Sequence, residues 1–277
     1  MESKHVHTSD GVSLHYLEAG SGPTLLMVHG WSQSAIQWKH QIAELSKHYR
    51  VIALDQRGHG DSEKPKHGLK IHRLAKDVHD VLKSLELSDV TLLGHSMGCS
   101  VIWAYWELFG NDHLKHLILA DEPPFLTFDP TWSATVLEQA GAIFPPQGVL
   151  DTCNALAGPD GEATTRGFIG NMVTANIAAE DKEFIIQRNF KMSRQDAATL
   201  FYNHCAQDWR DQIPRINIPT LVIGGRVSLV PWKSMEWTAQ QIPGARLELF
   251  EEAEGGQHFM FIENPGKFNQ IVREFMG

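Results

Sequence analysis

Residues 94–98 have the pattern Gly-x-Ser-x-Gly, with Ser96 at its centre. An apolar run at 89–93 precedes it and predicts a strand, and helical spacing of apolar residues at 99–109 follows it. Glycines on both sides of the serine allow a sharp turn from strand to helix that exposes the hydroxyl. The amino-terminal end of the helix favours negative charge that develops beside this hydroxyl. The pattern therefore predicts a nucleophilic serine.

Short apolar runs recur along the chain and predict strands at residues 12–16, 24–28, 50–54, 89–93, 114–120, 220–223 and 246–250. Continuous apolar strands imply a sheet that is covered on both faces, and therefore parallel strands with helical crossovers. Apolar residues with helical spacing predict a helix at 71–85, and the Asn264-Pro265 pair predicts the start of the last helix. Between about 123 and 219 the strand signals stop and helical spacing continues, for example at 184–192.

These signals predict an α/β fold with a mostly parallel central sheet, helices on both faces and a helical cap. Residues 1–122 and 215–277 form the expected core domain, and residues 123–214 form the expected cap. The cap is rich in aromatic residues, among them Phe144, Phe168 and Phe201. This composition favours an apolar substrate.

The charge balance argues against several kinds of partner. Lys and Arg number 24 and Asp and Glu number 33, which gives a net charge of −9. We therefore expect no binding to nucleic acid, which requires concentrated positive charge, and no binding to anionic membranes. No run of about 18 apolar residues is present for a membrane helix. We expect a small molecule as the partner, and a homodimer is left open.

The cysteines and histidines indicate the compartment and the cofactor requirement. Three cysteines at wide spacing argue against a disulfide framework, and residues 1–7 lack the apolar stretch of a signal peptide. We therefore expect a cytoplasmic protein. His-Glu-x-x-His spacing is absent, and Gly20–Gly22 lacks the continuation of a dinucleotide loop, so we expect neither a metal nor another cofactor.

Over essentially its full length the chain resembles the α/β-hydrolase superfamily. Four landmarks carry the resemblance: His29-Gly30-Trp31, the segment 55–62 with the sequence DQRGHGDS, the turn at Ser96, and His258 near the end of the chain. The resemblance implies that His258, on the loop after the last strand, is the general base that takes the serine proton. It implies that segment 55–62 is a packed turn outside the catalytic triad.

The same resemblance implies an oxyanion hole, the pair of N–H groups that binds the negatively charged oxygen of the transition state. The backbone N–H groups of Trp31 and Met97 occupy the matching positions, and Gly30 would let the backbone approach the substrate oxygen. The side chain of Trp31 is expected to line the pocket as well.

The triad acid departs from the usual pattern of the superfamily. Members commonly carry Asp after the penultimate strand, but the corresponding segment 224–231 has Val227 at that position. Some members, including dehalogenases and certain fungal lactonases, carry the acid after the strand that follows the nucleophile helix, which corresponds here to 114–120. We expect Glu122 to be the acid, with Asp121 as the alternative.

Dehalogenases and epoxide hydrolases of this fold use an Asp nucleophile, so Ser96 disfavours both activities. A serine with a base and an oxyanion hole suits acyl transfer. We expect a serine hydrolase that cleaves a carboxylic ester or lactone of an apolar small molecule through an acyl-enzyme. Two alternatives stay open: a receptor with slow or no turnover, which Val227 favours, and non-hydrolytic chemistry without a cofactor, such as oxygenation, perhydrolysis or lyase chemistry.

Overall fold

The computed structural model describes all 277 residues and contains one eight-stranded sheet. The strand order is β1-β2-β4-β3-β5-β6-β7-β8. β1 and β2 are antiparallel to their neighbours, and the other six strands are parallel. The predicted mostly parallel sheet is confirmed. The strands span Glu2–His7 (β1), Ser13–Ala19 (β2), Thr24–Val28 (β3), Arg50–Leu54 (β4), Val90–His95 (β5), Leu114–Ala120 (β6), Thr220–Gly225 (β7) and Arg246–Phe250 (β8).

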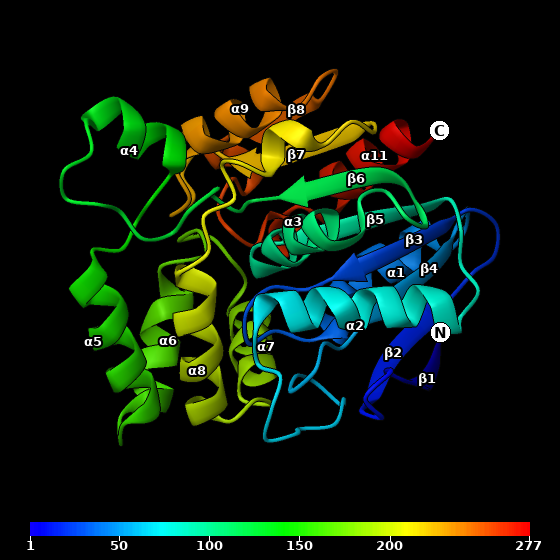
Figure 1. Cartoon of the computed structure of the whole chain (residues 1–277), viewed down its shortest axis with the longest axis horizontal. Helices are drawn as coiled ribbons and strands as arrows, with labels where there is room; N and C mark the ends of the chain where they lie inside the picture. The colour runs from blue at the N-terminus through cyan, green and yellow to red at the C-terminus, as the bar shows by residue number, and fades with distance from the viewer.

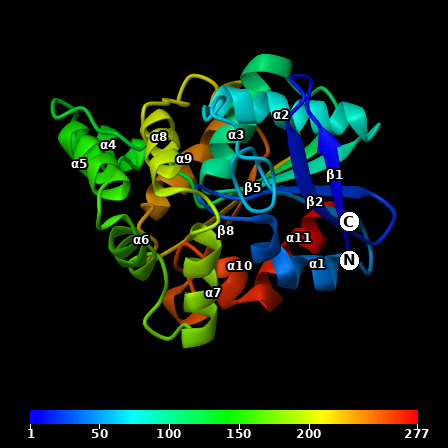
Figure 2. The same cartoon turned by 90° about the horizontal axis from the view of Figure 1, so that it is seen from below.

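Helices cover both faces of the sheet because its central strands are apolar on both sides. In β3, Leu26 and Val28 belong to one core cluster, while Leu25 and Met27 belong to the other. The first cluster includes residues of α2, α3 and α9, and the second includes residues of α1, α10 and α11. Figure 2 shows α2 and α3 on one side and α1, α10 and α11 on the other. These helices span Lys39–Leu45 (α1), Ile71–Ser84 (α2), Met97–Phe109 (α3), Trp232–Gln241 (α9), Met260–Glu263 (α10) and Pro265–Met276 (α11).

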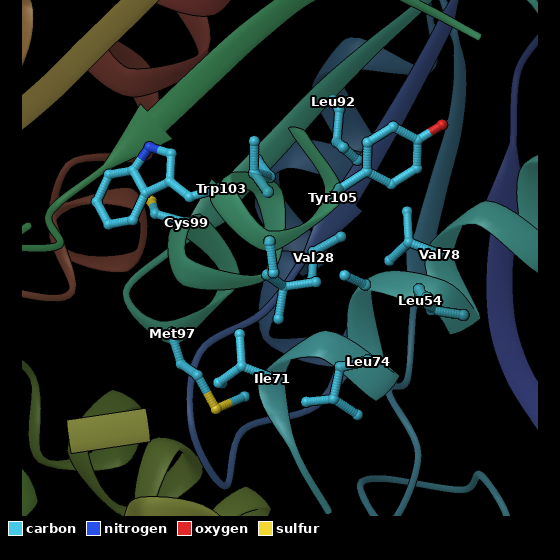
Figure 3. Packing of buried hydrophobic residues seen from close by; sticks show 14 of the residues in the cluster. Val28, Leu54, Ile71, Leu74, Val78, Leu92, Met97, Cys99, Trp103 and Tyr105 are labelled. Atoms are coloured by element: carbon cyan, nitrogen blue, oxygen red, sulfur yellow. The ribbon is translucent and has the colours of Figure 1, made fainter. Parts of the chain in front are cut away.

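The helix that follows the Ser96 turn lies deep in the core. Cys99, Trp103 and Tyr105 of α3 are fully or almost fully buried, and Figure 3 shows them among side chains of α2 and of the strands. Burial of large apolar side chains stabilises a protein by roughly 1.5–3 kcal/mol for each residue. The turn at Ser96 is therefore held between a buried strand and a buried helix.

Five helices lie between β6 and β7, where the sequence predicts the helical cap. Figure 1 shows four of them, α5 to α8, grouped beyond the carboxyl-terminal ends of the strands. Two of the five begin with a serine N-cap, since Ser133 accepts a hydrogen bond from Val136 N and Ser193 accepts one from Asp196 N. The helices span Ala134–Ala140 (α4), Pro146–Ala157 (α5), Gly161–Gly170 (α6), Ala179–Asn189 (α7) and Arg194–Cys205 (α8).

Parallel strands bring the loops after β5, β6, β7 and β8 to one edge of the sheet. These loops carry Ser96, Asp121 and Glu122, residues 226–231, and His258, respectively. Residues that are more than a hundred positions apart in the sequence are thereby brought together. No helix combines the length and the apolar composition needed to cross a bilayer.

Candidate active site

Ser96 occupies a strained turn between β5 and α3. Its φ of 53° and ψ of −130° lie outside the regions that residues with side chains usually occupy. A Cβ on Gly94 would lie 2.5 Å from the Gly98 carbonyl carbon, and a Cβ on Gly98 would lie 2.3 Å from Val28 O. Both glycines are therefore required by close packing of the backbone. Ser96 N donates to Ala120 O at 2.8 Å, which fixes the turn against β6.

His258 lies on the loop between β8 and α10 and is only 2% exposed. Its Nδ1 is 2.7 Å from Oδ2 of Asp121. A residue next to Ser96 also fixes this loop, because His95 Nε2 donates to the carbonyl oxygen of His258 at 2.8 Å. Burial, together with the nearby His258, lowers the pKa of His95 well below its usual value. His95 is therefore neutral near pH 7.

The carboxylate that contacts His258 is Asp121, so the expectation that Glu122 contacts it is wrong. β6 ends at Ala120, and Asp121 follows immediately with a left-handed φ of 56°. This conformation directs the Asp121 carboxylate toward His258 and the Glu122 side chain toward α3 and α8. The sequence does not mark this left-handed turn, which places the carboxylate one residue closer to β6 than expected.

The loop after β7 positions the Asp121 carboxylate. Ser228 Oγ donates to Oδ2 at 2.5 Å, and Gly225 N donates to Oδ1 at 3.2 Å. This is the loop that lacks an acid because of Val227. Val227 itself is 38% exposed, whereas Asp121 is fully buried. The end of β7 and the loop after it therefore supply hydrogen bonds to a carboxylate that directly follows the neighbouring strand β6.

Glu122 takes part in a second buried network. Its Oε1 accepts hydrogen bonds from Ser100 Oγ at 2.9 Å and from His204 Nε2 at 2.6 Å. Ser100 Oγ in turn accepts from Trp209 Nε1 at 3.1 Å. Glu122 and His204 are 3% and 4% exposed. This network joins the segment after β6 and helix α3 to helix α8. No local sequence pattern marks His204.

The segment around Gly30 approaches the nucleophile closely. A Cβ on Gly30 would lie 2.9 Å from Ser96 Cβ and 2.6 Å from Gln33 Nε2, so only glycine fits. The next residue, Trp31, has a backbone N–H that donates to no group of the chain. Met97 is the first residue of α3, a position whose N–H has no acceptor within its own helix. Both expected oxyanion donors thus flank the nucleophile turn.

A pocket of about 500 Å³, its mouth included, contains the candidate site. Sixteen residues line it, eleven of them hydrophobic, and Ser96 and His258 are among the polar ones. The expectation that Trp31 lines the pocket is confirmed. Its ring packs edge-on against Phe168 and Phe201, and its Nε1 donates to Ala197 O. Segment 123–214 contributes half of the lining, including Ile143, Phe144, Phe168, Ile169, Met172 and Phe201.

The charged segment 55–62 is a packed turn, as the resemblance implied. Asp55 accepts hydrogen bonds from Ala35 N at 2.6 Å, from Asp61 N at 2.9 Å and from the His15 ring at 2.7 Å. Burial alone would raise the pKa of Asp55, but these hydrogen bonds outweigh it and hold the pKa below its usual value. The segment contributes no residue to the pocket.

Two groups of three side chains place possible metal-ligand atoms within 4.8 Å of one another. Neither group borders the pocket that contains Ser96. The groups are His15, Asp55 and Asp61, and His79, Asp112 and His113. In the group that contains Asp55, this carboxylate already accepts two backbone hydrogen bonds.

Comparison with known proteins places the chain in a family. The sequence model of the family described as "alpha/beta hydrolase fold" matches residues 23–265. The chain belongs to this family. A relative from Kitasatospora aureofaciens, named non-heme chloroperoxidase CPO-A1, is 29% identical over 97% of the chain and 98% of its own length. The soluble epoxide hydrolase of a Corynebacterium species is 28% identical over 95% of the chain and 90% of its own length.

A solved structure shares the whole fold of this α/β-hydrolase. An esterase from Exiguobacterium antarcticum superposes with a TM-score of 0.90 and 25% identity, and each chain is covered completely. The names of the epoxide hydrolase and the esterase support a hydrolase.

Proposed function

We propose that the protein is a serine hydrolase that cleaves a carboxylic ester or lactone of an apolar small molecule through an acyl-enzyme. Ser96 is the nucleophile, His258 the base and Asp121 the acid, in place of the Glu122 expected from the sequence. The observation that carries the proposal is the 2.7 Å contact between His258 Nδ1 and Asp121 Oδ2, in a protein whose His258 and Ser96 line one pocket.

The proposed reaction begins when Ser96 Oγ attacks the substrate carbonyl carbon and His258 Nε2 takes the serine proton. Asp121 accepts the Nδ1 proton of His258, which keeps Nε2 free to act as the base and stabilises the imidazolium that forms. The N–H groups of Trp31 and Met97 bind the oxyanion, and each such donor contributes about 3 kcal/mol in comparable enzymes.

The tetrahedral intermediate collapses when His258 returns the proton to the departing alkoxide. A water molecule then attacks the acyl-enzyme while His258 takes its proton, and a second collapse releases the carboxylic acid and regenerates Ser96. Ser96 in place of an Asp nucleophile disfavours the alkyl-ester chemistry of epoxide hydrolysis. The receptor alternative rested on Val227, which leaves His258 without the usual acid; in the proposed triad Asp121, directly after β6, takes that role.

We further propose that segment 123–214 is a cap that shapes the apolar part of the substrate site. Its support is the aromatic cluster at the pocket, in which Phe201 packs edge-on against Phe144 and Phe168. Apolar walls favour acyl or alcohol groups with apolar surface, because each Å² removed from water contributes roughly 25 cal/mol.

Pre-steady-state hydrolysis of p-nitrophenyl acetate tests the proposal. The wild-type protein is expected to release a burst of nitrophenol of about one equivalent per chain, and Ser96→Ala to release none. Ser21→Ala is the matched control, because Ser21 is exposed and lies in the turn between β2 and β3. Equal turnover in wild type and Ser96→Ala would overturn the proposed function.

A further inference from the structure

A second carboxylate–imidazole pair borders the pocket, and the proposed reaction does not use it. Glu122 and His204 both line the pocket that contains Ser96, although each is more than nine-tenths buried. Their atoms Oε1 and Nε2 lie 2.6 Å apart. Apart from Ser96, His258 and Gln33, they are the only polar residues of the lining.

The hydrogen bonds of this pair use only one side of each group. Glu122 Oε1 accepts from both Ser100 and His204, whereas Oε2 accepts no hydrogen bond from the chain. His204 uses Nε2 for Glu122, and its Nδ1 has no partner in the chain. Neither Oε2 of Glu122 nor Nδ1 of His204 is a fully buried polar atom. Because both residues border the pocket, a group bound there can reach these two atoms.

A purely structural role does not account for this arrangement. Oε1 alone joins β6, α3 and α8, and a glutamine could accept the same two hydrogen bonds there. The carboxylate instead leaves a second acceptor at an otherwise apolar pocket. The pair therefore favours a hydrogen-bond donor as its partner.

We propose that Glu122 and His204 form a subsite that binds a hydroxyl group of the substrate, apart from the reacting ester or lactone. The inference rests on the proposed function and names its substrate class: apolar esters or lactones that carry a phenolic or alcoholic hydroxyl. A hydroxyl donates to Oε2 at modest desolvation cost. An ammonium group is disfavoured because burying its charge among eleven hydrophobic lining residues costs far more.

A series of p-nitrophenyl esters tests the subsite. The acyl groups are 3-phenylpropanoate and its hydroxy and methoxy derivatives, with each substituent placed in the meta or the para position. Wild type is expected to hydrolyse the better hydroxy ester with a kcat/KM about tenfold or more above the unsubstituted and methoxy esters, mainly through KM. A hydrogen bond to a charged acceptor has this size.

Glu122→Gln tests whether the subsite recognises the substrate hydroxyl as a hydrogen-bond donor or only by the shape of its substituent. With the amide oxygen bound to Ser100 and His204, the amide NH₂ replaces Oε2 and turns an acceptor into a donor. The preference for the hydroxy ester is expected to disappear and the methoxy ester to become the better substrate. Glu107→Gln is the matched control, because it breaks an exposed carboxylate–imidazole pair in which Glu107 lies 3.0 Å from His72.

A measurement on wild type avoids dependence on the folding of the variant. 3-(4-Hydroxyphenyl)propanamide and its meta isomer are expected to inhibit hydrolysis more strongly than the matching methoxyphenyl amides. Equal kcat/KM for all esters together with equal inhibition overturns the subsite but leaves the hydrolase intact. A hydroxy preference that survives unchanged in folded Glu122→Gln also overturns it. Absence of a nitrophenol burst with every ester refutes the proposed function instead.

Discussion

Replacement of Asp121 by asparagine is expected to abolish almost all turnover while the fold is retained. The carboxylate is fully buried and receives three hydrogen bonds: from His258 Nδ1 and Ser228 Oγ on Oδ2, and from Gly225 N on Oδ1. Asparagine has nearly the same shape but can accept on only one side. One of the three donors must therefore face the new NH₂ group.

The structure indicates which side the NH₂ group takes. If it faced Gly225, it would oppose a backbone N–H that cannot turn away. If it takes the place of Oδ2, the Ser228 hydroxyl can rotate and accept, and His258 must then accept at Nδ1. The proton of a neutral His258 moves to Nε2, which is the nitrogen that should take the proton of Ser96. The variant thus holds its base in the wrong tautomer.

The expected loss in kcat is about ten-thousandfold, equivalent to about 5 kcal/mol of transition-state stabilisation. Stopped-flow release of nitrophenol from p-nitrophenyl butyrate measures it, with thermal unfolding to check the fold. Asp129→Asn, at an exposed position of the loop after β6, is the matched control. A loss below about tenfold in a folded Asp121→Asn protein, or a larger loss in Glu122→Gln, would refute the assignment of the acid.

Three further predictions concern the Asp121 carboxylate, the nucleophile turn and the packed segment 55–62. Ser228→Ala removes one hydrogen bond to a buried carboxylate, so we expect kcat to fall about tenfold or more with little change in KM. Steady-state kinetics measure both constants, and a change in KM alone would contradict this prediction. Gly98→Ala places a Cβ 2.3 Å from Val28 O, so we expect a lower melting temperature by calorimetry or no folded protein; unchanged stability would contradict the close packing. Burial lowers the pKa of His59 to about 3, whereas an unfolded histidine titrates near 6.5. The stability that the buried neutral His59 contributes is therefore complete above pH 6.5. It is lost as the pH falls from 6.5 toward 3, by about 1.4 kcal/mol per pH unit. Urea titrations should show this pH dependence of the free energy of unfolding in wild type and not in His59→Gln.

The sequence predicts the strands of this sheet well because both of their faces are buried. The runs at 24–28, 50–54, 114–120 and 246–250 coincide with β3, β4, β6 and β8. The sequence does not predict strand β1, because this strand pairs only with β2 and buries Val6 alone among its residues. The individual cap helices other than α7 were also not predicted, because half-buried helices that contact several partners have weak apolar periodicity.

The sequence predicts those site residues whose positions are defined by a pattern of neighbouring residues. Ser96 is defined by its glycines, and His258 by its place after the last strand. The choice between Asp121 and Glu122 depends on one left-handed backbone conformation that the sequence does not mark. His204 lies on a cap helix 82 residues from Glu122, so no local pattern connects them. Gln33, whose Oε1 accepts from Gly30 N, lacks such a pattern as well.

Covalent labelling of Ser96 tests the central claim most directly. A fluorophosphonate probe reacts with a serine whose hydroxyl is activated by a neighbouring base, and mass spectrometry locates the adduct. We predict one adduct per chain, on the peptide that contains Ser96, with labelling at least a hundredfold slower in Asp121→Asn and absent in Ser96→Ala. An unmodified Ser96 in folded wild-type protein, or equal labelling rates in wild type and Asp121→Asn, would contradict the account.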